Sequence, residues 1–238
     1  MNIALIGYGK MGKAVEQIAI ARGHQIVLTI DESNRAAFTP KNIQQADVAI
    51  EFTGPDAAFE NVIFCLRNRV PVVCGSTGWL EKLPEAERIC KEHDSALIVA
   101  SNFSVGVNIF FEINRKLAEL MSHQKSYVPQ ITEIHHTHKK DAPSGTAISL
   151  ASDIMAAQPQ LKTWVNHASM QKDQLPIISE RIDPAPGTHH VRYRSEIDDI
   201  EIIHTAHNRN GFALGAVLAA EFLQSKQGVF TMKDVLQF

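Results

Sequence analysis

Residues 3–12 have the sequence IALIGYGKMG, a short apolar run followed at once by the glycine spacing GxGxxG. The run predicts a buried strand, and the residues after it have the periodicity of an amphipathic helix that Gly23 can end. Gly7 allows a tight turn, Gly9 lets a ligand approach the backbone, and Gly12 allows the helix to pack closely on the strand. A strand, such a turn and a helix together favour a site for the pyrophosphate of a dinucleotide.

A carboxylate supports this interpretation. Asp31 ends the second apolar run, close to the spacing of about 20 residues expected of the group that binds the adenine ribose. Residues 75–78 (GSTG) follow a later run and predict a second turn of small residues at the same sheet edge. Each feature alone has a plainer explanation, since GxGxxG can be a simple turn and Asp31 a solvated turn residue. Their combination favours dinucleotide binding.

Alternation of apolar runs with helix-length segments up to residue 104 predicts an α/β domain with a Rossmann-type doubly wound parallel sheet. Its strands are expected at 3–6, 26–30, 48–52, 72–74 and 97–100. A long apolar helix at 105–121 leads to a second α+β domain with an open mixed sheet. That domain has period-two strands at 130–136, 176–182, 190–194 and 201–205, and a helix at 145–157. A last helix at 212–223 is expected to pack on the first domain, which gives a dinucleotide-binding domain of 1–104 with 212–238 and a second domain of 105–211.

The composition is that of an ordinary globular protein of 238 residues, with 45% hydrophobic and 21% charged residues, which excludes disordered and collagen-like classes. A formal net charge of −3 gives no electrostatic footprint for nucleic acid. Cys65, Cys74 and Cys90 have neither disulfide-framework nor metal spacing, so we expect buried thiols in a reducing compartment. The N-terminus lacks the pattern of a signal peptide and no apolar window is long enough to span a membrane, which predicts a cytoplasmic protein without a membrane partner.

Residues 133–147, EIHHTHKKDAPSGTA, predict a site of chemistry. His135 ends a strand and can donate a proton near neutral pH. Lys139 supplies a compact positive charge, and residues 144–146 begin a helix whose free amides can hold a carboxylate. Together they predict a pocket for a carboxylated substrate that is protonated as it is reduced.

Two alternatives remain for this histidine-rich stretch. His135 and His138 could bind a metal, but adjacent residues at a strand end point in different directions and no spaced cysteine or carboxylate set completes a tetrahedron. Three histidines in four residues could also form a solvated loop. The neighbouring lysine and helix start favour the substrate pocket, and no metal is expected.

The sequence resembles the 4-hydroxy-tetrahydrodipicolinate reductase family, also named dihydrodipicolinate reductase, essentially from end to end. The motifs that carry the resemblance are GYGKMG at 7–12, EFTGP at 51–55, GSTG at 75–78, ASNFSVGVN at 100–108, EIHHTHKKDAPSGTA at 133–147 and HNRNGFALGA at 207–216. The resemblance implies a Rossmann domain joined to a substrate-binding domain that forms a homotetramer, and a place in the diaminopimelate route of lysine biosynthesis.

The resemblance also implies roles for single residues. His135 would be the proton donor and acceptor, and Lys139 the second catalytic residue. His136, Gly145 and Thr146 would hold the carboxylates of a small dicarboxylate substrate. Cofactor contacts would come from Gly7, Tyr8, Gly9, Lys10, Met11, Gly12, Asp31, Gly75, Ser76, Thr77, Ala100, Ser101, Asn102 and Phe103.

The implied reaction is the NAD(P)H-dependent reduction of 4-hydroxy-tetrahydrodipicolinate to tetrahydrodipicolinate and water. NADH is expected to be preferred or equal to NADPH, because Asp31 and Glu32 lie where the 2′-phosphate of NADPH would sit and only Arg35 could compensate. One alternative is another two-domain amino-acid dehydrogenase, which would lack the 133–147 signature. The other is a non-catalytic dinucleotide-sensing protein, and the presence of His135 and Lys139 argues against it.

Overall fold

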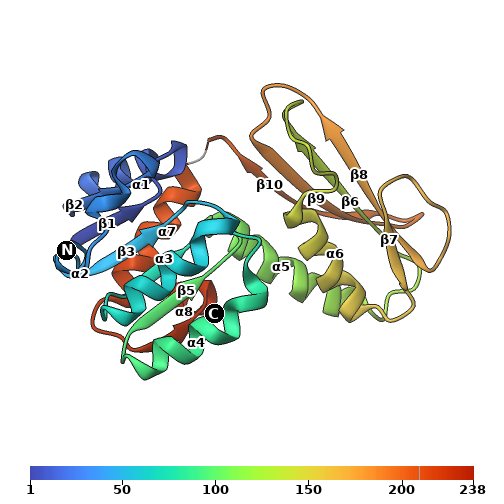
Figure 1. Ribbon diagram of the computed structural model, residues 1–238. Helices are drawn as coiled ribbons and strands as arrows, with labels where there is room; N and C mark the ends of the chain where they lie inside the picture. The colour runs from blue at the N-terminus through green and yellow to red at the C-terminus, as the bar shows by residue number, and fades with distance from the viewer. Residues whose placement is uncertain (209) are drawn as a thin grey trace. The chain divides into compact units, whose positions relative to one another are not determined.

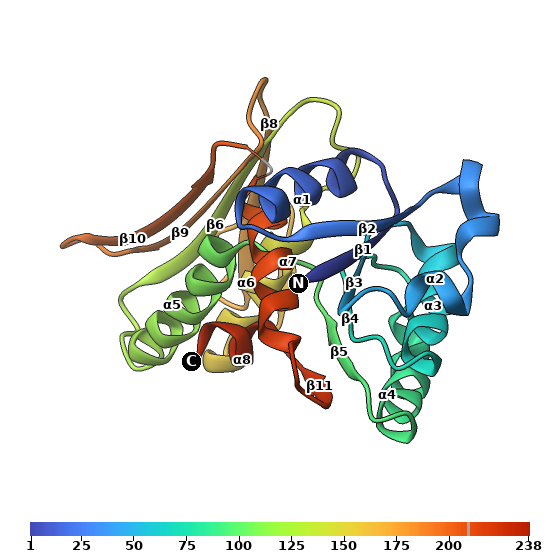
Figure 2. The ribbon, with the colours of Figure 1, turned by 90° about the vertical axis from the view of Figure 1, so that its left-hand side faces the viewer.

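The five apolar runs predicted in the N-terminal part form strands of one parallel sheet. The computed structural model describes residues 1–208 and 210–238. A sixth strand from near the C-terminus joins the sheet, whose order is β11-β5-β4-β3-β1-β2 (Figure 1 and Figure 2). Every neighbouring pair is parallel, which confirms the predicted Rossmann-type sheet. The strands are β1 (Asn2–Ile6), β2 (Gln25–Ile30), β3 (Val48–Glu51), β4 (Val72–Cys74), β5 (Ala96–Val99) and β11 (Gly228–Phe230).

Helices cover both faces of this sheet, because its central strands are apolar on both sides. Ile3 and Leu5 pack with α1, α7 and α8, whereas Ala4 and Ile6 point to the other face, where α2, α3 and α4 pack. Figure 2 shows α1 and α7 on one side of the sheet and α3 and α4 on the other. The bounds are α1 (Lys10–Ala21), α2 (Pro40–Ile43), α3 (Pro55–Arg67), α4 (Leu83–Glu92), α7 (Asn210–Leu223) and α8 (Met232–Leu236), with the 3₁₀ helices η1 (Glu32–Ala37) and η2 (Leu80–Lys82).

This first compact unit takes its residues from two parts of the chain, Met1–Val105 and the C-terminal segment that ends at Phe238. The C-terminal segment supplies α7, which packs on α1 and β3, and α8, whose N-cap is Thr231. The last long helix, α7, thus belongs to this first compact unit. β11 was not predicted from the sequence, because Gly-Val-Phe begins with glycine and gives no continuous apolar run.

The second compact unit, Gly106–Asn208, holds a mixed sheet of order β10-β9-β6-β8-β7, which confirms the predicted open mixed sheet. β6 runs parallel to β8 and antiparallel to β9. One face, with Ile131, Ile177 and Tyr193, packs on the helices. The elements are α5 (Val105–Met121), β6 (Val128–His135), α6 (Gly145–Ala157), β7 (Thr163–Val165), β8 (Gln174–Arg181), β9 (Gly187–Arg194) and β10 (Asp199–Ala206), of which β7 was not predicted.

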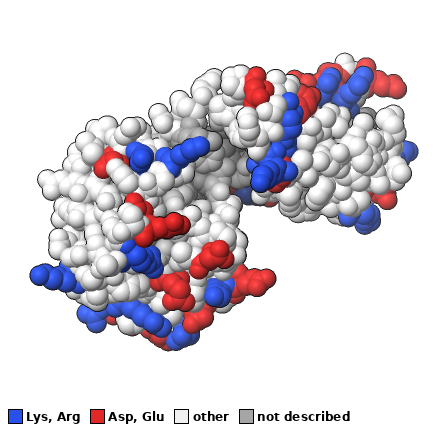
Figure 3. Space-filling model, turned by 45° about the horizontal axis from the view of Figure 1, so that its top comes forward, with Lys and Arg blue, Asp and Glu red and all other residues white. Residues whose placement is uncertain are grey.

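Acidic and basic side chains are interspersed over the face shown in Figure 3. In the described part of the chain, each helix is too short or too polar to cross a membrane. The mixed surface charge agrees with the small net charge of the sequence.

Helix α7 lies directly against the segment that follows β5. Phe103 of that segment is 2% exposed, and a Cβ on Gly215 would lie 1.7 Å from the Phe103 carbonyl oxygen. Only glycine allows this approach, so Gly215 sets how closely α7 packs beneath the carboxyl edge of the sheet.

We expect Gly215→Ala to lower the free energy of unfolding by about 1–3 kcal/mol, because α7 or Phe103 must move to admit the methyl group. In most helices the same change is stabilising by up to about 1 kcal/mol. Gly211→Ala is the matched control, since a Cβ there would lie 3.4 Å from the Ser104 hydroxyl oxygen, which is ordinary contact. Urea unfolding measures both variants, and a Gly215→Ala protein as stable as wild type would contradict the close packing.

Candidate active site

The turn between β1 and α1 depends on glycine at position 7. Gly7 has a φ of +95°, and a Cβ there would lie 2.2 Å from the Phe52 carbonyl oxygen. Its N–H donates to the Ile30 carbonyl at 2.8 Å, which ties the turn to the end of β2. Gly9 is the N-cap of α1 and offers no side chain to the first amides of the helix. Those amides can bind an anion such as a pyrophosphate, so this turn fits a dinucleotide.

Phe52, the residue after β3, packs against three of the turns at this sheet edge. Its carbonyl borders Gly7, and a Cβ on Gly75 would lie 2.0 Å from its ring. The ring also meets Phe103 edge to face, with centroids 6.0 Å apart. Phe52 thereby holds the turns after β1, β4 and β5 in fixed positions around the end of β3.

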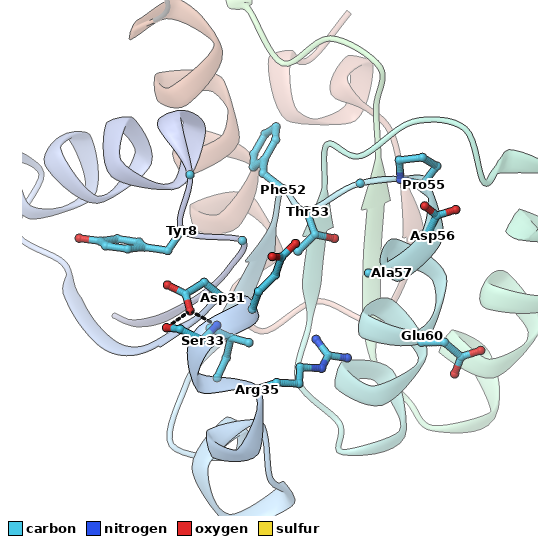
Figure 4. A pocket seen from close by; sticks show the side chains of 15 residues that line it. Tyr8, Asp31, Ser33, Arg35, Phe52, Thr53, Pro55, Asp56, Ala57 and Glu60 are labelled. Carbon is cyan, nitrogen blue, oxygen red and sulfur yellow. Dashed lines mark hydrogen bonds between the residues drawn. The ribbon is translucent and has the colours of Figure 1, made fainter.

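A cavity of about 1010 Å³ opens beside the ends of β1 and β2. Its walls are the β1–α1 turn, the residues from Ile30 to Arg35, and the segment 52–60. Figure 4 shows Arg35 extending from η1 toward the first turns of α3. The cavity has the position and the size of a site for the adenosine half of a dinucleotide.

Asp31 lines this cavity and caps η1. Its carboxylate accepts hydrogen bonds from the Ser33 hydroxyl at 2.6 Å and the Ser33 amide at 2.8 Å. These hydrogen bonds lower the pKa of Asp31, and the one from the Ser33 hydroxyl has the larger effect. Asp31 is therefore ionised at neutral pH. An ionised carboxylate at this place can accept hydrogen bonds from a ribose.

Four of the residues that the family resemblance assigns to the cofactor line the cavity, namely Gly7, Tyr8, Gly9 and Asp31. The others do not line it. Lys10, Met11 and Gly12 form the first turn of α1. The remainder lie in the turns after β4 and β5, at the same carboxyl edge of the sheet: Gly75, Ser76, Thr77, Ala100, Ser101, Asn102 and Phe103.

The segment after β3 was given no role from the sequence, although it forms one wall of the cavity. Thr53 is held there by Glu51, a fully buried carboxylate that accepts from the Thr53 amide at 2.9 Å and from the Cys74 thiol at 3.0 Å. The motif EFTGP follows the third strand, so its place at the carboxyl end was the signal that could have found it.

In the second unit, Glu133 and His135 are alternate residues of β6 and point to the same buried face. His135 Nδ1 is hydrogen-bonded to Glu133 Oε2. Arg181 of β8 places Nη2 2.9 Å from Glu133 Oε1. Burial raises the pKa of Glu133, but hydrogen bonds from His135, Ser179 and Arg181 outweigh it and lower the pKa to about 2. Glu133 is therefore ionised at neutral pH.

Lys139 lies in the loop after β6, where its ammonium is 2.8 Å from both carboxylate oxygens of Asp141. This contact with Lys139 lowers the pKa of Asp141. Arg181 Nη2 donates to the Asp141 carbonyl at 2.7 Å. Arg181 thus connects Glu133 with the loop that carries Lys139.

His189 of β9 connects His135 with the N-terminus of α6. It pairs with Glu133 in the strand register, and its ring meets that of His135 edge to face at 5.2 Å. Its Nε2 lies 3.0 Å from the hydroxyl of Ser144, which accepts from the Ala147 amide and caps α6. Burial, aided by His135, lowers the pKa of His189 to about 3, so its ring is neutral.

The N-terminus of α6 carries two of the residues that the resemblance assigns to the substrate. Gly145 and Thr146 are its first residues. The first amides of a helix attract carboxylates. The ring contact between His135 and His189 and the hydrogen bond between His189 and Ser144 therefore connect His135 with the N-terminus of α6.

His135 and His138, the pair that was weighed as an alternative metal site, do not belong to one cluster of possible ligand atoms. Among the described residues, ligand atoms of Glu133, His135 and His189 lie within 4.8 Å of one another, and His138 is not part of that cluster. Its ring lies 6.2 Å from that of His136. The clustered donor atoms already contact Ser144, Arg181 and each other, so the group suits a hydrogen-bond network better than a cation.

Two family models match consecutive parts of the sequence. Residues 1–103 match the dihydrodipicolinate reductase N-terminus, and residues 106–236 match the dihydrodipicolinate reductase C-terminus. The chain belongs to the dihydrodipicolinate reductase family. This confirms the resemblance drawn from the sequence motifs and identifies the chain as an oxidoreductase.

Named relatives of the reductase family match most of the chain. The 4-hydroxy-tetrahydrodipicolinate reductase of Christiangramia forsetii is 51% identical over 236 residues, which are 99% of this chain and 98% of that protein. The enzyme of the same name from Methanopyrus kandleri is 34% identical over 203 residues, 83% of this chain and 74% of that protein. The dipicolinate-bound dihydrodipicolinate reductase from Paenisporosarcina sp. TG-14 shares the fold, with a TM-score of 0.78, 23% identity and 97% of each chain covered.

We expect the stability that Glu133 contributes to this reductase to depend on pH. Folding lowers the pKa of Glu133 from 4.5 to about 2, so its contribution is complete above pH 5 or so and is lost as the pH falls through about 2. Glu133→Gln should be less stable than wild type by about 2–3 kcal/mol at neutral pH. Urea unfolding at a series of pH values measures the difference, which should shrink in acid. A difference that stays constant down to pH 3 would contradict this.

Proposed function

We propose that the chain catalyses the NADH- or NADPH-dependent reduction of 4-hydroxy-tetrahydrodipicolinate to tetrahydrodipicolinate and water, in the diaminopimelate route to lysine. The observation that carries the proposal is the network that joins His135 to the capped N-terminus of α6. It supplies a proton donor beside groups that bind carboxylates. Dipicolinate, bound by the Paenisporosarcina protein, is a small dicarboxylate, which supports this class of substrate.

Each unit has its own task in this proposal. Residues 1–104 with 212–238 bind the dinucleotide, and residues 105–211 bind the substrate and mediate assembly. The amides at the start of α1 hold the pyrophosphate, and Asp31 accepts from the ribose hydroxyls. The turns 75–77 and 100–103 complete this site at the same sheet edge. When bound, the nicotinamide coenzyme supplies the hydride.

The residues of the second unit orient the substrate and move the proton. Lys139 and the amides of Gly145 and Thr146 neutralise the two carboxylates, with His136 beside them. His135 delivers a proton to the anion that develops as the ring is reduced. Charge neutralisation by fixed groups lowers the barrier because these groups need no rearrangement during the reaction.

The test is a coupled assay, since the substrate is unstable. The upstream synthase makes the substrate in place, and oxidation of NADH is followed by its absorbance. We expect turnover that requires both the synthase and this chain. A rate no higher than that without this chain would overturn the proposed function.

We expect His135→Gln to lower kcat by about 10²- to 10⁴-fold while NADH still binds, because the variant loses the proton donor but keeps the glycine turn of the first unit. The assay above gives kcat, and fluorescence titration gives the affinity for NADH. A loss of less than about threefold would remove His135 as the proton donor.

We expect NADH to be preferred or at least equal to NADPH. Asp31 and Glu32 both line the cavity, so two negative charges face the place of a 2′-phosphate, and Arg35 is the cation that lines it. Comparison of kcat/KM for the two coenzymes at the same low salt concentration measures the preference. A clear preference for NADPH would show that Arg35 outweighs the two acids, and Arg35→Ala should then reverse it.

We propose that the chain forms a homotetramer through the open face of the second sheet. On the face opposite α5 and α6, Val128 is 60% exposed and Ile203 is 58% exposed. Exposed apolar side chains on a sheet face favour burial against another copy. Light scattering after gel filtration should give four chains, and a monomer at micromolar concentration would contradict the assembly.

The free, buried cysteines suit a reducing compartment, and we place the protein in the cytoplasm.

A further inference from the structure

The carboxylate of Glu133 is fully buried, and its two oxygens contact different partners. Oε2 is hydrogen-bonded to His135 Nδ1, and Oε1 lies 2.9 Å from Arg181 Nη2. Arg181 is fixed in turn, because its guanidinium donates at 2.7 Å to the carbonyls of Glu180 and Asp141. Each oxygen of Glu133 therefore has one defined partner.

This arrangement decides which nitrogen of His135 carries a proton when the ring is neutral. An ionised carboxylate can only accept hydrogen bonds, so Nδ1 must be the donor. The proton that the ring gains or loses is then the one on Nε2, which lies beside Gly187 at the start of β9. A neutral ring with its hydrogen on Nδ1 is the form left after the imidazolium has donated from Nε2.

The other charged and titratable groups around His135 support the same assignment. His189 of β9 faces the His135 ring and is neutral. It therefore places no second positive charge beside Glu133. Arg181 of β8 is a cation beside Glu133. It stabilises the carboxylate and so prevents Glu133 from taking the His135 proton itself.

We propose that Glu133 is a positioning residue for His135: its carboxylate holds the Nδ1 hydrogen, so that the ring exchanges protons only through Nε2. The imidazolium breaks its Nε2–H bond as the proton passes to the substrate, and the lone pair stays on Nε2 until solvent returns a proton. The inference rests on the proposed function for the identity of the proton acceptor, but the tautomer is a property of the protein alone.

The first test uses nuclear magnetic resonance of the protein labelled with ¹⁵N-histidine and needs no turnover. In the wild type we expect a deshielded, slowly exchanging Nδ1 proton that is absent from His135→Gln. In Glu133→Gln the amide oxygen faces Arg181, which can only donate, so the amide NH₂ faces Nδ1. We therefore expect the neutral ring to carry its hydrogen on Nε2 in that variant. A wild-type ring protonated on Nε2 but not on Nδ1 at neutral pH would overturn the proposal.

The second test is kinetic. Glu133→Gln should lower kcat by about 10²-fold or more, because the wrong tautomer is favoured and the imidazolium loses its partner. The KM for the substrate should change less than about threefold, since the carboxylate-binding groups remain. In a His135→Gln background, adding Glu133→Gln should cost less than about threefold, because a residue that acts through His135 has nothing left to act on. Independent, multiplicative losses would overturn the proposal.

Two further variants separate positioning from general damage. Glu196→Gln removes an exposed carboxylate from the turn between β9 and β10, and should leave both kcat and the His135 signals unchanged. Glu133→Asp keeps the charge, and should retain the Nδ1 proton and recover part of the activity lost in Glu133→Gln. If the wild type has no reductase activity, the proposed function fails, and the wild-type tautomer alone then decides this inference.

Discussion

The close packing of Phe52 is the constraint on which the dinucleotide side of the structure depends. Strands of a parallel sheet end at a common edge, but their turns have no ladder of hydrogen bonds between them. Phe52 supplies that connection, with its carbonyl against Gly7 and its ring against Gly75 and Phe103. The backbone of Phe103 in turn packs directly against Gly215 of α7. A displacement at any one of these positions is therefore transmitted to the others.

In the second unit, the main constraint is that charged groups, above all the Glu133 carboxylate, are buried. Removing a carboxylate from water is costly, and its attraction to one cation rarely compensates. Glu133 has two partners on neighbouring positions of β6 and β8, and His189 stays neutral beside it. The strand register fixes the separations, because His135 lies opposite Arg181 and Glu133 opposite His189. Rigid strands thus give the buried charges a single arrangement.

The sequence predicted those parts of the fold and site that depend on local patterns. Apolar runs located β1 to β5, and the glycine spacing located the turn before α1. It failed where the signal was short or distant. β7 (Thr-Trp-Val) and β11 (Gly-Val-Phe) begin with a polar residue or glycine and are only partly buried, so neither has a continuous apolar run like the Val-Val-Cys of β4. His189 and Arg181 reach His135 only through pairing of strands far apart in the chain, and no spacing along the sequence encodes that pairing.

The composition of the first unit from both ends of the chain determines the order in which the protein can be completed during synthesis. When residue 208 has left the ribosome, the second unit has all its residues, but the first sheet still lacks α7 and β11. Ile3, Leu5 and Ile50 then face solvent on the side that α7 later covers. The nascent chain is prone to aggregation at this stage, because its first strands are covered only after α7 has been synthesised. The N-terminal domain is thus the last to mature.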